Sequence, residues 1–239
     1  ERLAAAAPAV AMDLSDASRC LALQRAIAAA ELAARPPACE AIYDRTVGCY
    51  DETFRAWGYP SPARAAELLK LHLGSSAAGA LPVLDAGCGT GLSSEALREA
   101  GFADLVGVDV SQASLRVCGR KGLHQALHVA DLECHSPLPF GSGAFRAVVC
   151  VGVLSYVSGF DRLFGEWCRI TAPGGVIIFS HRVELWDGDV DGVRSAAASL
   201  EQSKAWAQRF ASGPEEYMPR SPSPRQRAKR VRYLVYDVL

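Results

Sequence analysis

Three closely spaced glycines are the residues of this 239-residue sequence whose spacing most clearly suggests a binding site. Gly87, Gly89 and Gly91 follow the apolar run 81–86 and precede an amphipathic segment, so a strand should lead through a tight turn into a helix. Glycine lets the backbone turn sharply and approach a ligand closely, because it has no Cβ. The N-terminus of the following helix would offer free N–H groups to that ligand. This pattern predicts a ligand site at the carboxyl end of the strand.

The spacing of these glycines and of the aspartates after them narrows the class of ligand. A dinucleotide fingerprint needs G-x-G-x-x-G, but Leu92 stands at the third position, and no Gly-Lys-Ser/Thr follows as in a phosphate-binding loop. Asp109 ends the next expected strand, where its carboxylate could accept both hydroxyls of a ribose. Asp131, followed by Leu132, ends the strand after that and could contact an adenine. These features favour a nucleoside ligand; in the alternative, both aspartates only cap turns.

The elements that must position these residues can be read from residue 81 onward. Short apolar runs alternate there with amphipathic segments, which predicts an α/β fold with a mostly parallel sheet covered by helices on both faces. Right-handed crossovers would make the sheet doubly wound. The expected strands are 81–86, 104–109, 126–130, 145–151 and 175–181, and the expected helices are 92–100, 111–121, 161–171 and 193–212. The run 232–239 should add a terminal antiparallel strand.

The N-terminal third of the sequence has a different pattern, with helical segments only. We expect helices over 14–35, over roughly 41–57, and over 61–74, where Ser61 and Pro62 mark the start. The prediction is therefore an N-terminal helical extension or cap over residues 1–75, followed by the core over residues 76–239.

Composition and charge exclude several classes of protein. The chain is 50% hydrophobic with a formal net charge of −1, which gives no general attraction to nucleic acid or anionic lipid. No apolar run reaches the length of a membrane span, so we expect a soluble intracellular protein, either cytoplasmic or, because the sequence begins without Met, processed for an organelle. The eight cysteines contain no C-x-x-C pair, which favours reduced thiols and no metal site.

Taken together, the motifs resemble those of the class I S-adenosylmethionine-dependent methyltransferases. The resemblance covers roughly residues 43–239, and within the class it is strongest to the methyltransferase-like proteins named for the Williams–Beuren region. It implies a Rossmann-like sheet of seven strands, with S-adenosyl-L-methionine as cofactor and S-adenosyl-L-homocysteine as product. The motifs that carry it are D-x-G-C-G-T-G at 85–91, the aspartate at the end of the run 106–109, the sequence Ala-Asp-Leu at 130–132, and Pro-Gly-Gly at 173–175.

The resemblance also implies which residues hold the cofactor. The turn would line the methionine part, Asp85 would orient its ammonium group directly or through water, and Asp109 and Asp131 would bind ribose and adenine. The tyrosines before the core would close over the carboxylate end, or they are ordinary aromatics of the cap. The full implied set is Tyr43, Tyr50, Asp85, Gly87, Cys88, Gly89, Gly91, Asp109, Val110, Asp131, Leu132 and Cys150.

Methyl transfer from a sulfonium is an in-line displacement in which the protein mainly aligns the reacting groups and excludes water. A base is needed only if the acceptor arrives protonated. Tyr156, after the fourth strand, and His181, at the end of the fifth, are the catalytic candidates; His181 could instead be a hydrogen-bonded strand-end residue. The expected acceptor is a small molecule.

Two other functions stay open at this point. One is a structural or accessory subunit of a larger assembly, organellar or not, which would need a protein partner and little or no turnover. The other is a methyltransferase acting on RNA or protein, favoured only by the basic residues between 220 and 232; a solvated loop is the simpler interpretation, and nucleic acid is not expected to bind.

Overall fold

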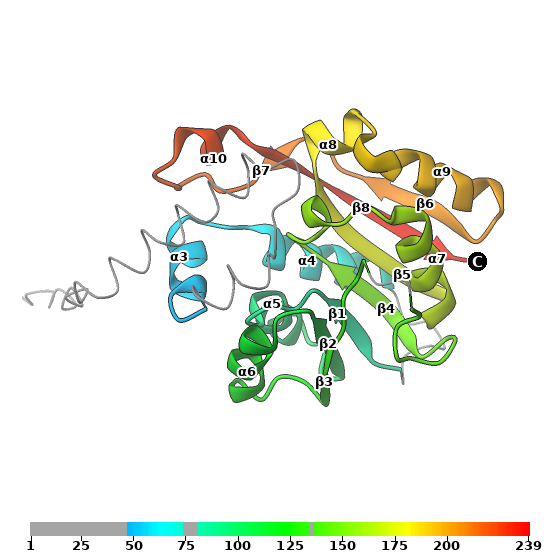
Figure 1. Cartoon of the computed structure of the whole chain (residues 1–239), viewed down its shortest axis with the longest axis horizontal. Helices are drawn as coiled ribbons and strands as arrows, with labels where there is room; N and C mark the ends of the chain where they lie inside the picture. Colours follow the sequence, from blue (N-terminus) through cyan, green and yellow to red (C-terminus); the bar gives the residue numbers. More distant parts are fainter. Residues whose placement is uncertain (1–46, 74–80, 134–135) are drawn as a thin grey trace, which may run out of the picture.

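An eight-stranded sheet forms the centre of the described part of the chain, residues 47–73, 81–133 and 136–239, in the computed structural model (Figure 1). The strand order is β3-β2-β1-β4-β5-β8-β6, with β7 paired to β8. The strands are β1 Val83–Ala86, β2 Leu105–Asp109, β3 Ala126–Val129, β4 Phe145–Cys150, β5 Thr171–Arg182, β6 Trp206–Ala211, β7 Glu215–Glu216 and β8 Arg230–Val238.

The first five strands run parallel, and the last three are antiparallel to their neighbours. β1 lies between β2 and β4, with β3 beyond β2 and β5 beyond β4. β8 runs antiparallel to β5, β6 and β7. This confirms the predicted α/β class and the antiparallel C-terminal strand; the eighth strand is the two-residue β7.

Helices cover both faces of the sheet (Figure 1). Their bounds are α3 Tyr50–Ala56, α4 Ser61–Leu73, α5 Leu92–Glu99, α6 Gln112–Arg120, α7 Phe160–Ile170, α8 Val183–Asp187, α9 Val193–Gln202 and α10 Pro224–Ala228, with single turns η2 Leu154–Tyr156 and η3 Val190–Gly192. The predicted start of α6 is confirmed, because the Ser111 hydroxyl accepts a hydrogen bond from the Ser114 N–H at 3.0 Å.

Alternate residues of the central strands build two cores, one on each face of the sheet, as the two-residue period of a strand requires. One core packs strand residues such as Leu84 and Val148 against α7 and α9, whereas their neighbours Val83 and Val149 pack against α4 and α5. Because strands buried on both faces carry apolar residues throughout, the runs that identified them in the sequence are nearly continuous.

The helix expected over 193–212 is wrong in its second half. Helix α9 ends at Gln202, Lys204 turns the chain with a φ of 59°, and strand β6 begins at Trp206. The Trp206 ring stacks on Tyr236 of β8 with 4.0 Å between centroids. Pairing with β8 and this aromatic contact therefore outweigh the helical appearance of the segment.

The N-terminal predictions are only partly covered by the described residues. The expected helix 14–35 and Tyr43 lie outside them, while α3 and α4 fall within the expected helices 41–57 and 61–74. None of the helices in the described ranges is both long and apolar enough to cross a membrane.

Candidate functional site

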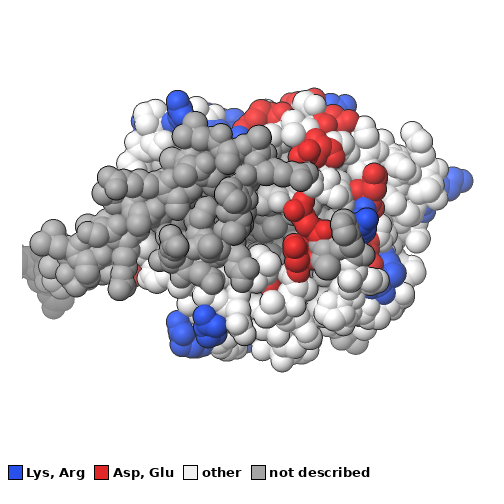
Figure 2. Space-filling model, viewed as in Figure 1, with Lys and Arg blue, Asp and Glu red and all other residues white. Residues whose placement is uncertain are grey.

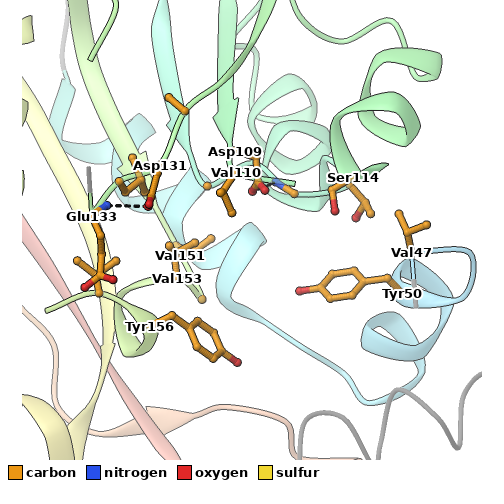
Figure 3. A pocket seen from close by; sticks show the side chains of 17 residues that line it. Val47, Tyr50, Asp109, Val110, Ser114, Asp131, Glu133, Val151, Val153 and Tyr156 are labelled. Carbon is orange, nitrogen blue, oxygen red and sulfur yellow. Dashed lines mark hydrogen bonds between the residues drawn. The ribbon is translucent and has the colours of Figure 1, made fainter. Parts of the chain in front are cut away.

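A cavity of about 380 Å³ opens at the carboxyl ends of the parallel strands, in the size range of small-molecule sites, roughly 300–1,000 Å³ (Figure 3). It is bounded by the glycine turn, the ends of β2 and β3, the segment after β4, and α3. The predicted residues that line it are Tyr50, Gly87, Gly89, Asp109, Val110, Asp131, Leu132 and Tyr156. The predicted residues not among its lining are Asp85, Cys88, Gly91, Cys150 and His181.

The glycine turn follows β1 with all three glycines in the left-handed region, at φ values of 77°, 52° and 96° for Gly87, Gly89 and Gly91. A side chain at Gly87 would also clash, since its Cβ would lie 2.3 Å from Cγ2 of Val153. The turn therefore brings bare backbone to the cavity, as its glycine content predicts.

The Asp109 carboxylate ties the end of β2 to this turn. Its Oδ2 accepts a hydrogen bond from the Gly89 N–H at 2.8 Å, and its Oδ1 accepts one from the Ser111 N–H at 2.8 Å. Burial raises the pKa of Asp109 above its ordinary value, although these two N–H groups oppose the shift. The Val110 N–H also opposes the shift, and the carboxylate lines the cavity, where a ligand hydroxyl can donate to it.

The loop after β3 contributes two more carboxylates to the cavity. Asp131 accepts a hydrogen bond from the Glu133 N–H at 2.9 Å, as drawn in Figure 3. The Glu133 carboxylate accepts from both the N–H and the hydroxyl of Ser158 at 2.6 Å, so it joins the β3 loop to the segment that carries Tyr156. Sequence reasoning missed Glu133, although its position two residues after Asp131 was a usable signal.

Asp85 lies behind the glycine turn, with 1% of its surface exposed. Its Oδ2 accepts hydrogen bonds from the hydroxyls of Ser93 and Ser94, at 2.6 and 2.5 Å. Its Oδ1 is buried and has no hydrogen-bond partner among the described residues. Burial raises the pKa of this carboxyl group above its ordinary value.

Helix α3 forms the opposite wall, and the Tyr50 side chain points from it into the cavity (Figure 3). The next residue, Asp51, accepts a hydrogen bond from the Thr90 hydroxyl of the glycine turn at 2.5 Å and pairs with Lys121 at 2.5 Å. Lys121 also pairs with Glu95 of α5 at 2.8 Å. Charge pairing thus fixes α3 against the turn and the end of α6.

The two catalytic candidates lie in different environments. Tyr156 lines the cavity from η2. His181 is 3% exposed and packs against Phe160 and Trp186, with ring centroids 5.8 and 6.5 Å away. Neither ring nitrogen of His181 has a hydrogen-bond partner in the described part of the chain. Burial, reinforced by Arg182, lowers the pKa of His181 to about 4, so its ring is neutral at pH 7.

This burial of His181 predicts an acid-sensitive stability. The unfolded chain binds a proton at this residue below its ordinary pKa of about 6.5, whereas the folded chain resists protonation until pH falls to about 4. The free energy of unfolding is therefore unaffected by this residue above pH 6.5, the ordinary pKa. It falls on acidification, by roughly 2 kcal/mol between pH 7 and pH 5. Urea unfolding at both pH values should show that His181→Phe removes this loss; equal losses in variant and parent would contradict it.

The Cys88 side chain belongs to a second group behind the turn rather than to the cavity. Ligand atoms of Cys88, Cys118 and His124 all lie within 4.8 Å of one another, although their positions in the sequence show no ligand spacing. A hydrogen bond with the nearby Cys88 thiol lowers the pKa of Cys118 to about 6, against the effect of burial.

The basic C-terminal segment makes hydrogen bonds both within its own loop and to neighbouring segments, as Arg232 does to the Ser212 carbonyl. Arg227 donates to the carbonyls of Ser221 and Pro222, and Arg230 to those of Arg227 and Lys229. On the face seen in Figure 2, acidic side chains gather across the middle, while Lys and Arg lie mostly toward the margins. These observations favour the structural interpretation of the basic residues over a phosphate-binding surface.

The sequence matches the family model described as a methyltransferase domain over residues 84–179. It is 33% identical over 166 residues to Methyltransferase-like protein 27 of Homo sapiens, covering 69% of this chain and 66% of that protein. It is 31% identical over 129 residues to the Ubiquinone biosynthesis O-methyltransferase of Bordetella avium, covering 50% of this chain and 51% of that protein. The chain thus spans less than two thirds of the length of these curated relatives.

Solved structures share the fold at low sequence identity. An S-adenosylmethionine-dependent methyltransferase from Mesorhizobium loti has a TM-score of 0.52 at 19% identity, covering 72% of this chain and 97% of that one. Geranyl diphosphate methyltransferase in complex with S-adenosylmethionine has a TM-score of 0.52 at 16% identity, covering 85% and 93%. The [4+2]-cyclase SpnF has a TM-score of 0.57 at 16% identity, covering 74% and 80%. The cyclase shows that one fold carries different reactions, so the site must decide the chemistry.

Proposed function

The chain belongs to the class I S-adenosylmethionine-dependent methyltransferases, and on this premise we propose that it transfers the cofactor's methyl group to a small-molecule nucleophile by in-line displacement. The observation that carries the proposal is the Asp109 carboxylate, which lies in the cavity wall while bonded to the Gly89 N–H of the glycine turn. One hydrogen bond therefore joins the two elements expected to hold the sugar and the methionine part of the same ligand.

The residues around the cavity fit this cofactor. The Gly87 and Gly89 backbones leave room for the methionine part, and the Asp109 carboxylate in the cavity wall can accept hydrogen bonds from ribose hydroxyls. We assign Asp131 to the adenine amino group, with Val110 and Leu132 beside the ring, because all three line the cavity and follow the ends of the neighbouring strands β2 and β3. Asp85 is not among the lining residues, so any contact with the ammonium group would pass through water.

The cofactor supplies a methyl group already activated by a sulfonium leaving group. The chain has to hold an acceptor in line and exclude water, which can lower the barrier by several kcal/mol. We expect Tyr156 to contact the acceptor, because it lines the cavity beside apolar residues of the segment after β4. Tyr50, on the facing helix, would close over the cofactor.

The charge of the cavity supports a neutral or cationic acceptor. Its lining includes the carboxylates of Asp109, Asp131 and Glu133 but no Lys, Arg or His among the described residues. Such a lining attracts a positively charged sulfonium and repels an anionic acceptor.

The test has two stages. Calorimetric titration with S-adenosylhomocysteine should first show binding. Incubation with radiolabelled S-adenosylmethionine and a cell extract, separated by size, should then place the label in the low-mass fraction. Label in RNA or protein would overturn the proposed acceptor class, and binding without any labelled product would overturn turnover itself.

The ion pairs of α3 predict a second effect on the same titration. Lys121→Met removes the cation shared by Asp51 and Glu95, so α3 and Tyr50 should be held less firmly over the cavity. We expect affinity for S-adenosylhomocysteine to fall roughly fivefold, corresponding to about 1 kcal/mol for a partly exposed pair. Lys70→Met, on the exposed surface of α4, is the matched control and should bind as the parent does. Unchanged affinity in Lys121→Met would show that α3 needs no such anchor.

A further inference from the structure

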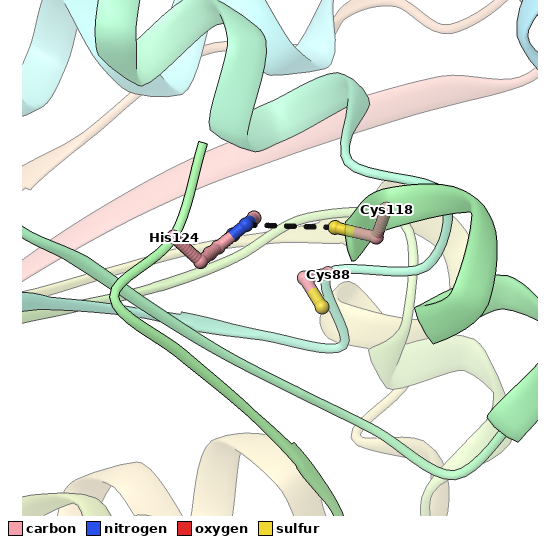
Figure 4. A group of neighbouring side chains, drawn as sticks. All are labelled: Cys88, Cys118 and His124. Carbon is pink, nitrogen blue, oxygen red and sulfur yellow. Dashed lines mark hydrogen bonds between the residues drawn. The ribbon is translucent and has the colours of Figure 1, made fainter. Parts of the chain in front are cut away.

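Two cysteines and a histidine from three separate elements converge behind the glycine turn (Figure 4). Cys88 lies in the turn after β1, Cys118 on α6, and His124 in the loop before β3. Cys118 Sγ lies 3.6 Å from His124 Nδ1, and the three ligand atoms all fall within 4.8 Å of one another. Cys88 and Cys118 are 3% and 0% exposed.

The hydrogen bonds around His124 determine which nitrogen faces the thiols as an acceptor. The Ser94 hydroxyl has a single proton, which it donates to Oδ2 of Asp85 at 2.5 Å. Its contact with His124 Nε2 at 2.7 Å therefore requires the ring to donate from Nε2. In the neutral form of the ring, Nδ1 then has its lone pair on the side of Cys118.

This is the arrangement that protein metal sites use. A metal-binding imidazole generally donates its other N–H to a nearby acceptor, often one linked to a carboxylate, which fixes the tautomer and the ring orientation. Here the Ser94 hydroxyl and Asp85 supply that support. Two cysteine sulfurs and one imidazole nitrogen form a soft donor set, which favours thiophilic ions over magnesium or calcium.

We propose that Cys88, Cys118 and His124 bind a zinc ion. The charge of the complex favours Zn²⁺ over a monovalent ion, since two thiolates and a neutral imidazole around Zn²⁺ give a neutral group, and burial disfavours net charge. Three protein ligands leave the fourth tetrahedral position for an exogenous ligand such as water. This proposal departs from the sequence-based expectation of no metal site, because ligands so far apart in sequence meet only through the fold.

Zinc here would link the glycine turn to α6 and to the loop before β3. A Cβ on Gly107 of β2 would lie 2.9 Å from Cys88 Sγ. The Cys88 thiol can therefore occupy this position only because residue 107 has no side chain. Zinc binding requires neither cofactor nor acceptor. Failure of methyl transfer would therefore leave this proposal standing, and the reverse also holds.

The experiment uses the full chain, stripped with a chelator under reducing conditions. Zn²⁺ titrated in competition with a chromophoric chelator should bind stoichiometrically, and Co²⁺ in its place should give thiolate-to-cobalt charge-transfer absorption. Both signals should be lost in Cys118→Ala and His124→Gln and retained in Cys168→Ala, a half-buried cysteine on α7 outside the cluster. Ser94→Ala, which keeps all three ligands but removes the hydroxyl that links His124 to Asp85, should weaken Zn²⁺ binding by about 10- to 100-fold.

Circular dichroism of each variant separates loss of the site from loss of the fold. His124→Gln keeps a polar residue in a loop, so it is the variant expected to disturb the fold least. Absence of stoichiometric Zn²⁺ in the folded, reduced parent would overturn the proposal. So would a cobalt spectrum without thiolate absorption, or equal Zn²⁺ affinity in the parent and in folded Cys118→Ala or His124→Gln.

Discussion

Asp109→Ala should weaken binding of S-adenosylhomocysteine by about 100-fold or more, because two charge-assisted hydrogen bonds to the ribose would be lost at roughly 1.5–3 kcal/mol each. The same substitution leaves the N–H groups of Gly89 and Ser111 without their carboxylate acceptor. The turn and the start of α6 would then lose the link that orients both toward the ligand. The loss should appear in the dissociation constant measured by calorimetry.

A control for this effect lies just before the same strand. Asp104 precedes β2 at its amino end, away from the cavity lining, where its side chain accepts a hydrogen bond from Gln125 at 2.8 Å. Asp104→Ala should therefore bind S-adenosylhomocysteine as the parent does. Near-parental affinity in Asp109→Ala would exclude a ribose-binding role for this carboxylate.

Gly87→Ala should both destabilise the chain and abolish cofactor binding. The residue has a φ of 77°, and the new Cβ would lie 2.3 Å from Cγ2 of Val153. Left-handed strain and overpacking together cost roughly 2–6 kcal/mol. Relief of the clash would push Val153 or the turn out of place, and both line the cavity. Chemical unfolding and calorimetry with S-adenosylhomocysteine measure the two effects separately.

Two further variants separate strain from clash. Gly174 has a φ of 75° with nothing within 4 Å of an added Cβ, so Gly174→Ala reports the backbone strain alone. Adding Val153→Ala to Gly87→Ala should recover the part of the loss that comes from the clash. If Gly87→Ala lost no more stability than Gly174→Ala, the contact with Val153 would not limit the turn.

The sequence predicted the parallel core well because its signals are local. The strand before Gly87 and the acid ending the strand at Asp109 follow from runs of a few residues, and parallel strands bring their carboxyl ends to one edge of the sheet. The same logic placed Asp131 at the cavity. It failed at Trp206, since pairing with β8 is a long-range contact that the local pattern does not report.

The site was predictable to a similar extent and for the same reason. Residues next to strand ends, such as Val110, line the cavity as expected, whereas His181 does not, because the direction of a strand-end side chain depends on what packs over it. The meeting of Cys118 with His124 needed the turn after α6, and no spacing rule describes it. Whether each lining residue has its assigned role stays a prediction.

The position of β8 has a consequence for how the chain is made. β6 is synthesised before β8 yet joins the sheet only through it, since β8 lies between β5 and β6. Until residues 230–238 have left the ribosome and paired, β5 has an open edge and β6 has no neighbour in the sheet. Unpaired edges of this kind invite association between chains. The interval before β8 emerges is therefore when newly made molecules should most need a chaperone.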